Sequence, residues 1–178
     1  MKLYETNEIR NIALLGHIGS GKTTLSEAML VISGTKEKMG NTLNGTTSSD
    51  YHKEEKEKHF SIRLSPLTME YQGHKYNILD YPGYEDFKGD IYSSIDIIDG
   101  AVLVIDGSSG IELGTINSWK LLEDNNIPRI IFINKMNKGF INYKKLLESL
   151  KEKFGKKLAS LSIPIGDKGN FNGLINRV

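Results

Sequence analysis

Gly16-His17-Ile18-Gly19-Ser20-Gly21-Lys22-Thr23 matches the phosphate-binding pattern G-x-x-x-x-G-K-[ST]. An apolar run, residues 12–15, precedes the stretch, and a helix-like run, residues 24–30, follows it. Strand, glycine loop and helix are the context that the pattern requires. Glycines let successive backbone N–H groups curl around a phosphate, and the start of the helix adds its positive dipole end. The stretch therefore predicts a nucleotide phosphate site, against the alternative of a chance match in a glycine-rich turn.

The composition is that of one globular domain of 178 residues, with 38% hydrophobic and 25% charged residues. The chain has no cysteine, which excludes a disulfide framework and a thiolate metal site. Residues 1–8 are too acidic and polar for a signal peptide, so we expect a cytoplasmic protein. No apolar run is long enough to cross a bilayer, and the net charge of +1 does not call for nucleic acid or a membrane.

Apolar strand-type segments alternate with helix-type segments along the chain. We expect strands over residues 11–15, 60–71, 75–79, 101–106, 130–133 and 158–163. We expect helices over residues 24–32, about 87–99, 113–124 and 143–154. Residues 35–59 fit either a mobile loop or a solvated surface loop, with a short helix in the charged part, and residues 166–178 are loop-like. This alternation predicts an α/β fold with a mostly parallel, doubly wound sheet flanked by helices.

Asp80 and Asn134 follow two of the predicted strands. Ligands of such sheets lie at the carboxyl ends of strands, so we expect both residues to join the phosphate loop in one site. Lys22 is expected to reach the β- and γ-phosphates, while the Thr23 hydroxyl and Asp80 hold Mg²⁺, Asp80 commonly through water. The N–H of Gly83 is placed to reach the γ-phosphate, although D-x-P-G alone is also an ordinary turn.

Asn134 and Lys135 are candidates for recognition of a purine base. The side-chain amide of Asn134 can pair with the base edge, while the stem of Lys135 packs flat against the ring. A turn with two exposed polar residues is the alternative. The position of the pair after the other two motifs suits a GTPase.

The chain resembles elongation factor G over nearly its whole length. The general GTP-binding motifs are matched by residues 16–23, Ser61, residues 80–83 and residues 134–136. The closer likeness is carried by Gly-His-Ile-x-x-Gly-Lys-Thr-Thr, Gly45-Thr46-Thr47 with Asp50, Leu79-Asp80-x-Pro-Gly-x-x-Asp86-Phe87, Asp99-Gly100-Ala101 and Ile127-Pro128-Arg129-x-x-Phe-Ile-Asn-Lys-Met. Within that family the chain looks most like the divergent second form, where Pro-Gly-Tyr also appears. Ribosomal-protection tetracycline resistance proteins are similar, but less closely.

The resemblance implies a P-loop NTPase fold of the GTPase type and a translational GTPase that uses GTP, GDP and Mg²⁺. It implies that residues 35–62 are switch I and that residues 80 to about 89 are switch II, which order around the γ-phosphate and release on hydrolysis. The implied partner is the ribosome, including ribosomal RNA. We expect a monomer, with no DNA or membrane partner.

The motifs and the resemblance together define the candidate site. The catalytic candidates are Lys22, Gly83 and Tyr84, and the metal candidates are Thr23, Ser61 and Asp80. The nucleotide-binding candidates are Gly16, His17, Ile18, Gly19, Ser20, Gly21, Lys22, Thr23, Thr24, Asp80, Asn134, Lys135 and Asn137.

Several positions depart from the family pattern. Tyr84 stands where the family has a water-positioning His, and a phenol with a pKa near 10 cannot replace an imidazole, so we expect slow hydrolysis. Asn137 stands where the family has Asp. An amide presents one acceptor and one donor where a carboxylate accepts twice, so we expect a loss of about 1–3 kcal/mol in guanine binding, weakened guanine selectivity and a better fit to a xanthine edge. Gly19 and Ser20 replace an Asp-Ala pair, and Ser61 replaces a Thr but keeps the hydroxyl.

The family's last nucleotide motif, a Ser-Ala stretch over the base, has no match. We therefore expect residues 1–178 to be a GTP-binding domain that lacks its C-terminal part and all later domains. Three functions remain open. The first is the switch of an elongation factor G-like GTPase in translocation-type ribosome action. The second is a nucleotide-binding regulatory module with weak or no hydrolysis. The third is a phosphate-loop ATPase or kinase, but the Asn134-Lys135 pair argues against it.

Overall fold

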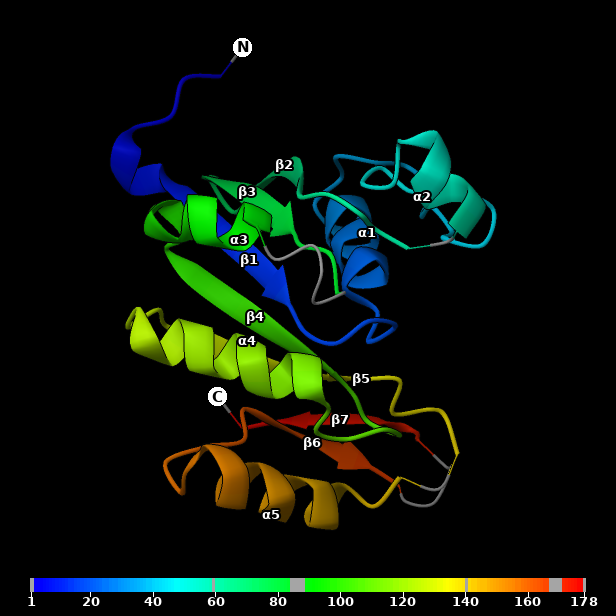
Figure 1. Cartoon of the computed structure of the whole chain (residues 1–178), viewed down its shortest axis with the longest axis vertical. Helices are drawn as coiled ribbons and strands as arrows, with labels where there is room; N and C mark the ends of the chain where they lie inside the picture. The colour runs from blue at the N-terminus through cyan, green and yellow to red at the C-terminus, as the bar shows by residue number, and fades with distance from the viewer. Residues whose placement is uncertain (1, 59, 84–88, 140, 167–170, 178) are drawn as a thin grey trace.

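A five-stranded sheet with the order β2-β3-β1-β4-β5 forms the centre of the computed structural model, which describes residues 2–58, 60–83, 89–139, 141–166 and 171–177. Its strands are β1 (Ile9–Leu15), β2 (Ser65–Tyr71), β3 (His74–Asp80), β4 (Gly100–Asp106) and β5 (Arg129–Asn134). Strands β3, β1, β4 and β5 run parallel, and β2 pairs antiparallel with β3. All four parallel strands therefore place their carboxyl ends at one edge of the sheet (Figure 1).

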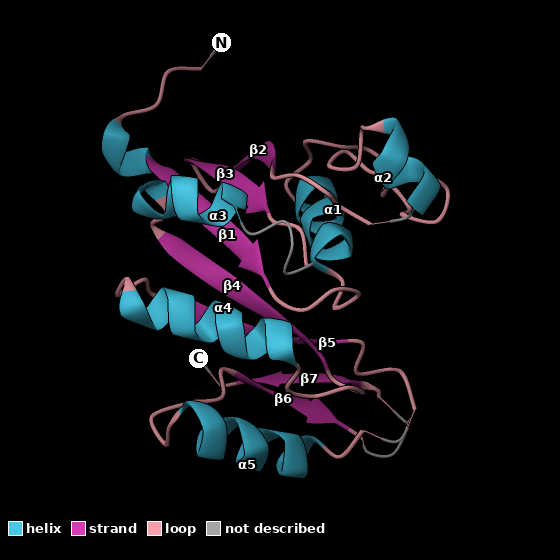
Figure 2. Cartoon of the chain, viewed as in Figure 1, coloured by secondary structure: helices cyan, strands magenta, loops and turns pink. Residues whose placement is uncertain are grey.

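Helices cover the sheet on both faces (Figure 2). They are α1 (Lys22–Ile32), α3 (Gly89–Ser94), α4 (Leu113–Asp124) and α5 (Tyr143–Phe154), while the short α2 (Lys53–Lys58) lies apart. The described residues also include 3₁₀ turns at Thr6–Glu8 and Ile95–Ile97. None of the helices in the described ranges is long and apolar enough to cross a membrane.

The buried side chains of the central strands explain the two helical layers. Leu14 of β1 faces a cluster that includes Leu30 of α1, whereas the next residue, Leu15, faces a cluster that includes Leu122 of α4. Because successive strand residues point to opposite faces, a continuous apolar strand needs cover on both sides. The expected α/β class, with a mostly parallel sheet between helices, is confirmed.

Several predicted elements have different bounds. Residues 60–64 were expected to begin a strand, but β2 begins at Ser65. The reason is visible in the hydrogen bonds: side-chain carboxylates take the N–H groups of Ile62, Arg63 and Leu64, so these groups do not join a strand ladder. The helix expected over about 87–99 is α3 followed by the 3₁₀ turn, and residues 84–88 lie outside the described part of the chain.

The bounds predicted for the last strand were wrong, and so was the absence of a strand after it. The strand expected over residues 158–163 is β6 (Ser162–Ile165), and the expected loop after it contains β7 (Gly173–Asn176). The two strands form a separate antiparallel sheet. Four-residue strands carry too few alternating positions to be recognised from periodicity, and here the pairing of the two strands defines both.

Candidate nucleotide-binding site

The phosphate loop joins the end of β1 to the start of α1 and lies against the ends of the neighbouring strands. Gly16, Gly19 and Gly21 have φ values of +141°, +72° and +97°, a region that L side chains rarely adopt. A Cβ at Gly16 would collide with the carbonyl oxygen of Val104, and one at Gly21 would collide with the side chain of Asn134. The backbone conformation therefore favours glycine at all three positions, and close contact with β4 and β5 additionally requires it at Gly16 and Gly21.

Lys22 is buried beneath this loop. Its Nζ donates hydrogen bonds to the carbonyl oxygens of Gly16 and His17, each at 3.1 Å. Burial lowers the pKa of Lys22 to about 8, although the charge of Asp80 opposes the change. Gly83 covers the ammonium group so closely that a Cβ there would lie 2.7 Å from Nζ. The ammonium group is thus held among backbone atoms on the side of the loop that faces the segment after β3.

Four oxygen-bearing side chains meet next to Lys22. Thr23 Oγ1 donates to Asp80 Oδ2 at 2.9 Å and lies 3.2 Å from Ser61 Oγ. Ser61 Oγ in turn donates to Asp50 Oδ1 at 2.7 Å. Thr23 comes from α1 and Asp80 from the end of β3, while Asp50 and Ser61 come from the long connection between α1 and β2. The structure therefore brings the three predicted metal candidates together and adds Asp50.

The electrostatics of this cluster fit a bound cation. Asp80 is completely buried, and burial raises its pKa to about 6 against the opposing effects of Lys22 and Thr23. Its Oδ1 makes no hydrogen bond of acceptable geometry in the described part of the chain, although Ser49 lies close enough to lower the pKa. A buried carboxylate oxygen without a donor is stabilised by a positive charge.

The donor set selects the kind of cation. Among the described residues no group of three or more His, Cys, Asp or Glu side chains could hold a metal by itself. Mg²⁺ is usually bound by one or two carboxylates together with waters and substrate phosphates. The hydroxyls of Thr23 and Ser61 and the carboxylate of Asp80 fit Mg²⁺ held jointly with a nucleotide.

Asn134 and Lys135 support the loop from its other side. Asn134 Nδ2 donates to the carbonyl oxygen of Ser20 at 3.0 Å, and its Oδ1 accepts from the N–H of Lys135 at 2.8 Å. Lys135 Nζ donates to Asp106 Oδ2 at 2.6 Å and to the carbonyl oxygen of Gly19. Although burial acts in the opposite direction, the hydrogen bonds from Lys135 and Ser108 lower the pKa of Asp106 to about 2.

The remaining candidates make no hydrogen bond to the cluster of metal candidates in the described part of the chain. Thr24 and Asn137 are exposed, the first on the opening turn of α1 and the second in the turn after β5. His17 is partly exposed, and its Nε2 lies 3.5 Å from a carboxylate oxygen of Glu112. Ile18 packs against Gly83: a Cβ added at Gly83 would lie 2.7 Å from the Cα of Ile18. Tyr84 lies outside the described residues. The roles of all the candidates remain predictions.

Three residues of this region had no role assigned from sequence. Asp50 was part of the resemblance only, and nothing in its Thr- and Ser-rich surroundings indicates that it meets Ser61. Asp106 ends β4 at the same edge as Asp80 and Asn134, so its position at a strand end was an available signal. Glu27 lies in the middle of α1 and gave no signal, because an isolated Glu in a helix is normally solvated.

Comparison with known proteins gives consistent results. Residues 7–169 match the family described as "Elongation factor Tu GTP binding domain". The chain is 36% identical over 175 residues to elongation factor G of Petrotoga mobilis, which covers 98% of this chain and 25% of the relative. It is 37% identical over 171 residues to mitochondrial ribosome-releasing factor 2 of Pongo abelii, and this match covers 96% of this chain and 22% of the relative.

A solved structure agrees with the sequence comparisons. A crystal structure of a protein from Thermus thermophilus superposes with a TM-score of 0.89 at 37% identity, over 95% of this chain and 25% of that one. At this level of identity and coverage the chain has the P-loop GTPase fold, with the phosphate loop between β1 and α1. The chain spans about a quarter of the length of these relatives.

Proposed function

We propose that this chain, which belongs to the family of elongation factor Tu GTP-binding domains, binds GTP and GDP with Mg²⁺ and hydrolyses GTP. The observation that carries the proposal is the cluster of Thr23, Ser61 and the buried Asp80 beside the ammonium group of Lys22. Oxygen ligands next to a glycine loop and a buried cation are the parts from which such sites are built. Residues 1–178 act in this proposal as one GTP-binding unit.

Each residue has a physical task in the proposed site. The backbone N–H groups of the loop and the ammonium group of Lys22 bind the β- and γ-phosphates. Thr23, Asp80 and Ser61 hold Mg²⁺, which neutralises charge that develops on the phosphates. Gly83 lies against Lys22 and Ile18, where its N–H can approach the γ-phosphate only because it has no side chain. Asn134 and Lys135, at the end of β5, lie on the side of the loop where the base is expected.

The proposed setting is translation. The relatives are named elongation factor G and ribosome-releasing factor, and both names concern the ribosome. We propose a translational GTPase that acts on the ribosome, including its RNA, in a translocation-type step. The proposed protein is a cytoplasmic monomer without DNA or membrane partners.

A regulatory module with weak hydrolysis and relaxed guanine selectivity is the second candidate. Tyr84 and Asn137 favour it, because a phenol cannot act as the imidazole that positions water and an amide presents one donor where a carboxylate accepts twice. Single-turnover hydrolysis with ribosomes separates the candidates. A rate as fast as that of an ordinary elongation factor would contradict the slow step assigned to Tyr84.

A nucleotide titration tests the proposal directly. We expect the chain to bind GTP and GDP in the presence of Mg²⁺ and to reject ATP, with XDP binding measurably because of Asn137. Lys22→Ala should weaken GTP binding by roughly 10- to 100-fold, the effect of a lost charge-assisted hydrogen bond. Lys38→Ala is the matched control, because Lys38 is exposed. Equal affinity for ATP and GTP would overturn the proposal.

A further inference from the structure

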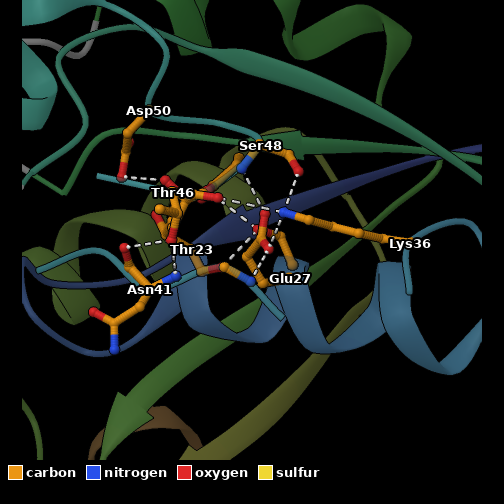
Figure 3. A network of polar contacts seen from close by, with 11 residues as sticks. Thr23, Glu27, Lys36, Asn41, Thr46, Ser48 and Asp50 are labelled. Carbon is orange, nitrogen blue, oxygen red and sulfur yellow. Dashed lines mark hydrogen bonds and ion pairs between the residues drawn. The ribbon is translucent and has the colours of Figure 1, made fainter. Parts of the chain in front are cut away.

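Glu27 is a fully buried carboxylate on α1, outside the cluster of metal candidates. Its Oε2 accepts hydrogen bonds from Lys36 Nζ and from the N–H of Gly40, both at 2.6 Å, and its Oε1 accepts from the N–H of Ser48 at 2.6 Å (Figure 3). These bonds offset the effect of burial and lower the pKa of Glu27. The carboxylate is therefore charged at neutral pH, with three donors in place of water.

All three donors come from the first half of switch I, although Glu27 itself lies on the helix after the phosphate loop. Lys36 Nζ also donates to Ser48 Oγ at 2.9 Å and to the carbonyl oxygen of Thr46 at 3.5 Å. At Gly40 an added Cβ would lie 2.6 Å from Glu27 Oε2, so the backbone approaches the carboxylate as closely as glycine permits. We call Glu27 with Lys36 the Glu27 anchor.

The anchor lies next to the metal candidates along the chain. Two residues after Ser48, Asp50 accepts hydrogen bonds from Thr47 Oγ1 at 3.2 Å and from Ser61 Oγ at 2.7 Å. The chain between them is fixed by Ser65 Oγ, which donates to the carbonyl oxygen of Ser49 at 2.6 Å. The backbone before Asp50 therefore has two supports, the hydrogen bond from Ser48 to Glu27 and the one from Ser65 to Ser49. Loss of the first leaves Asp50, and the Ser61 hydroxyl bonded to it, less firmly placed.

Stability alone does not explain why the chain buries the charge of Glu27. Glu27 is fully buried and the Lys36 side chain is 28% exposed. Apolar residues of similar volume often stabilise a fold as well as a buried charge does, whereas loss of Lys36 would leave the Glu27 carboxylate without its counter-charge. The anchor holds a segment that has no strand ladder and little apolar anchoring of its own: Met39 and Leu43 are 48% and 71% exposed. What the pair supplies is one defined position for this segment.

We propose that Glu27 and Lys36 are positioning residues that hold switch I closed over the magnesium site and thereby set how strongly Mg²⁺ tightens GTP binding. The inference rests on the proposed GTP-binding function. It assigns the anchor no contact with the nucleotide, so its effect reaches Mg²⁺ only through Asp50 and Ser61.

The test compares Lys36→Met with Lys36→Arg and with the control Lys38→Met. Dissociation constants of fluorescent GTP and GDP are measured with Mg²⁺ and with EDTA. For Lys36→Met we expect the Mg²⁺-dependent tightening of GTP binding to fall by about tenfold, within the usual range of coupling between two sites. GDP affinity in EDTA should change less than twofold. Lys36→Arg, which keeps the charge, should restore most of the tightening.

Hydrogen exchange of the nucleotide-free protein provides the second readout. The amides of Gly40 and Ser48 should exchange faster in Lys36→Met and in Glu27→Gln, and at the original rate in Lys38→Met. Unchanged tightening of GTP binding in Lys36→Met would overturn the inference, whatever the exchange rates are. If the wild-type chain binds no guanine nucleotide, the proposed function is overturned and the inference falls with it. The exchange rates are measured without nucleotide, so they do not depend on the proposed function.

Discussion

The phosphate loop and switch I both border the candidate metal site, but they are held in different ways. Backbone conformation holds the loop: its three glycines have positive φ values, and two of them, Gly16 and Gly21, lie against β4 and β5. Buried carboxylates hold switch I. Glu27 binds the first half of the segment, and Glu55 binds the N–H groups of Ile62 and Arg63 at 2.9 and 3.2 Å.

The difference explains how one site can combine a rigid part with a part that moves. A loop defined by sterics has one conformation, because every alternative brings atoms into collision. A segment held by a few ion pairs and hydrogen bonds has a second state available once those bonds are exchanged for water or ligand. Substitutions that disrupt the first kind of support should therefore have larger effects than substitutions that disrupt the second.

Gly16→Ala should have the largest effect. Its Cβ would collide with the carbonyl oxygen of Val104, so we expect a loss of about 3 kcal/mol of unfolding free energy together with loss of nucleotide binding. Gly19→Ala is the matched control: φ is also positive, but no atom lies within 4 Å of an added Cβ, so only about 1 kcal/mol is expected. Urea denaturation measures both, and equal losses would show that collision is not what restricts the loop.

Asp106→Asn tests the support of the loop from β4. The pKa of Asp106 is about 2 against an ordinary 3.8, so the carboxylate stabilises the folded state above pH 3.8, and this contribution is lost as the pH falls through 2. We expect the variant to lose about 2 kcal/mol at pH 7 and to approach the wild type near pH 2. Denaturation curves across this pH range measure the difference. A difference that is constant with pH would contradict the assignment.

Glu55→Gln should loosen switch I and leave the sheet intact. The amide keeps one acceptor for the two N–H groups but loses the charge, so we expect a local loss of about 1 kcal/mol. Limited proteolysis should cut residues 46–62 several-fold faster, while the global urea midpoint changes little. Exposed Glu54 provides the matched control, Glu54→Gln. Equal cleavage of both variants would remove Glu55 as a support of this segment.

Ser61→Thr should have the smallest effect. The substitution restores a methyl group and keeps the hydroxyl that lies 3.2 Å from Thr23 Oγ1, so we expect the Mg²⁺ dependence of GTP binding to change less than twofold, about 0.4 kcal/mol. Ser61→Ala, measured in the same titration, should weaken that dependence by more. If the two variants behave alike, the hydroxyl of Ser61 does not act at the metal site.

Much of the fold was predictable because its signals are local. Helices α4 and α5 have the predicted bounds, since their apolar residues recur with helical spacing and clear stop signals follow. Residues 60–64 and the β6–β7 sheet were mispredicted for the opposite reason. The N–H groups of residues 62–64 go to the side chains of Glu55 and Asp90 instead of a strand ladder, and the β6–β7 sheet is defined by the pairing of its two strands.

The sequence alone determined the phosphate loop, the α/β class and the edge of the sheet where Asp80 and Asn134 lie, because glycine spacing and strand periodicity are properties of neighbouring residues. Only the tertiary structure decided which groups meet there. Asp50 reaches Ser61 across 11 residues, and Lys135 reaches Asp106 across 29. Such pairs leave no periodic pattern in the chain, since their contact depends on where burial and strand order place the two backbones.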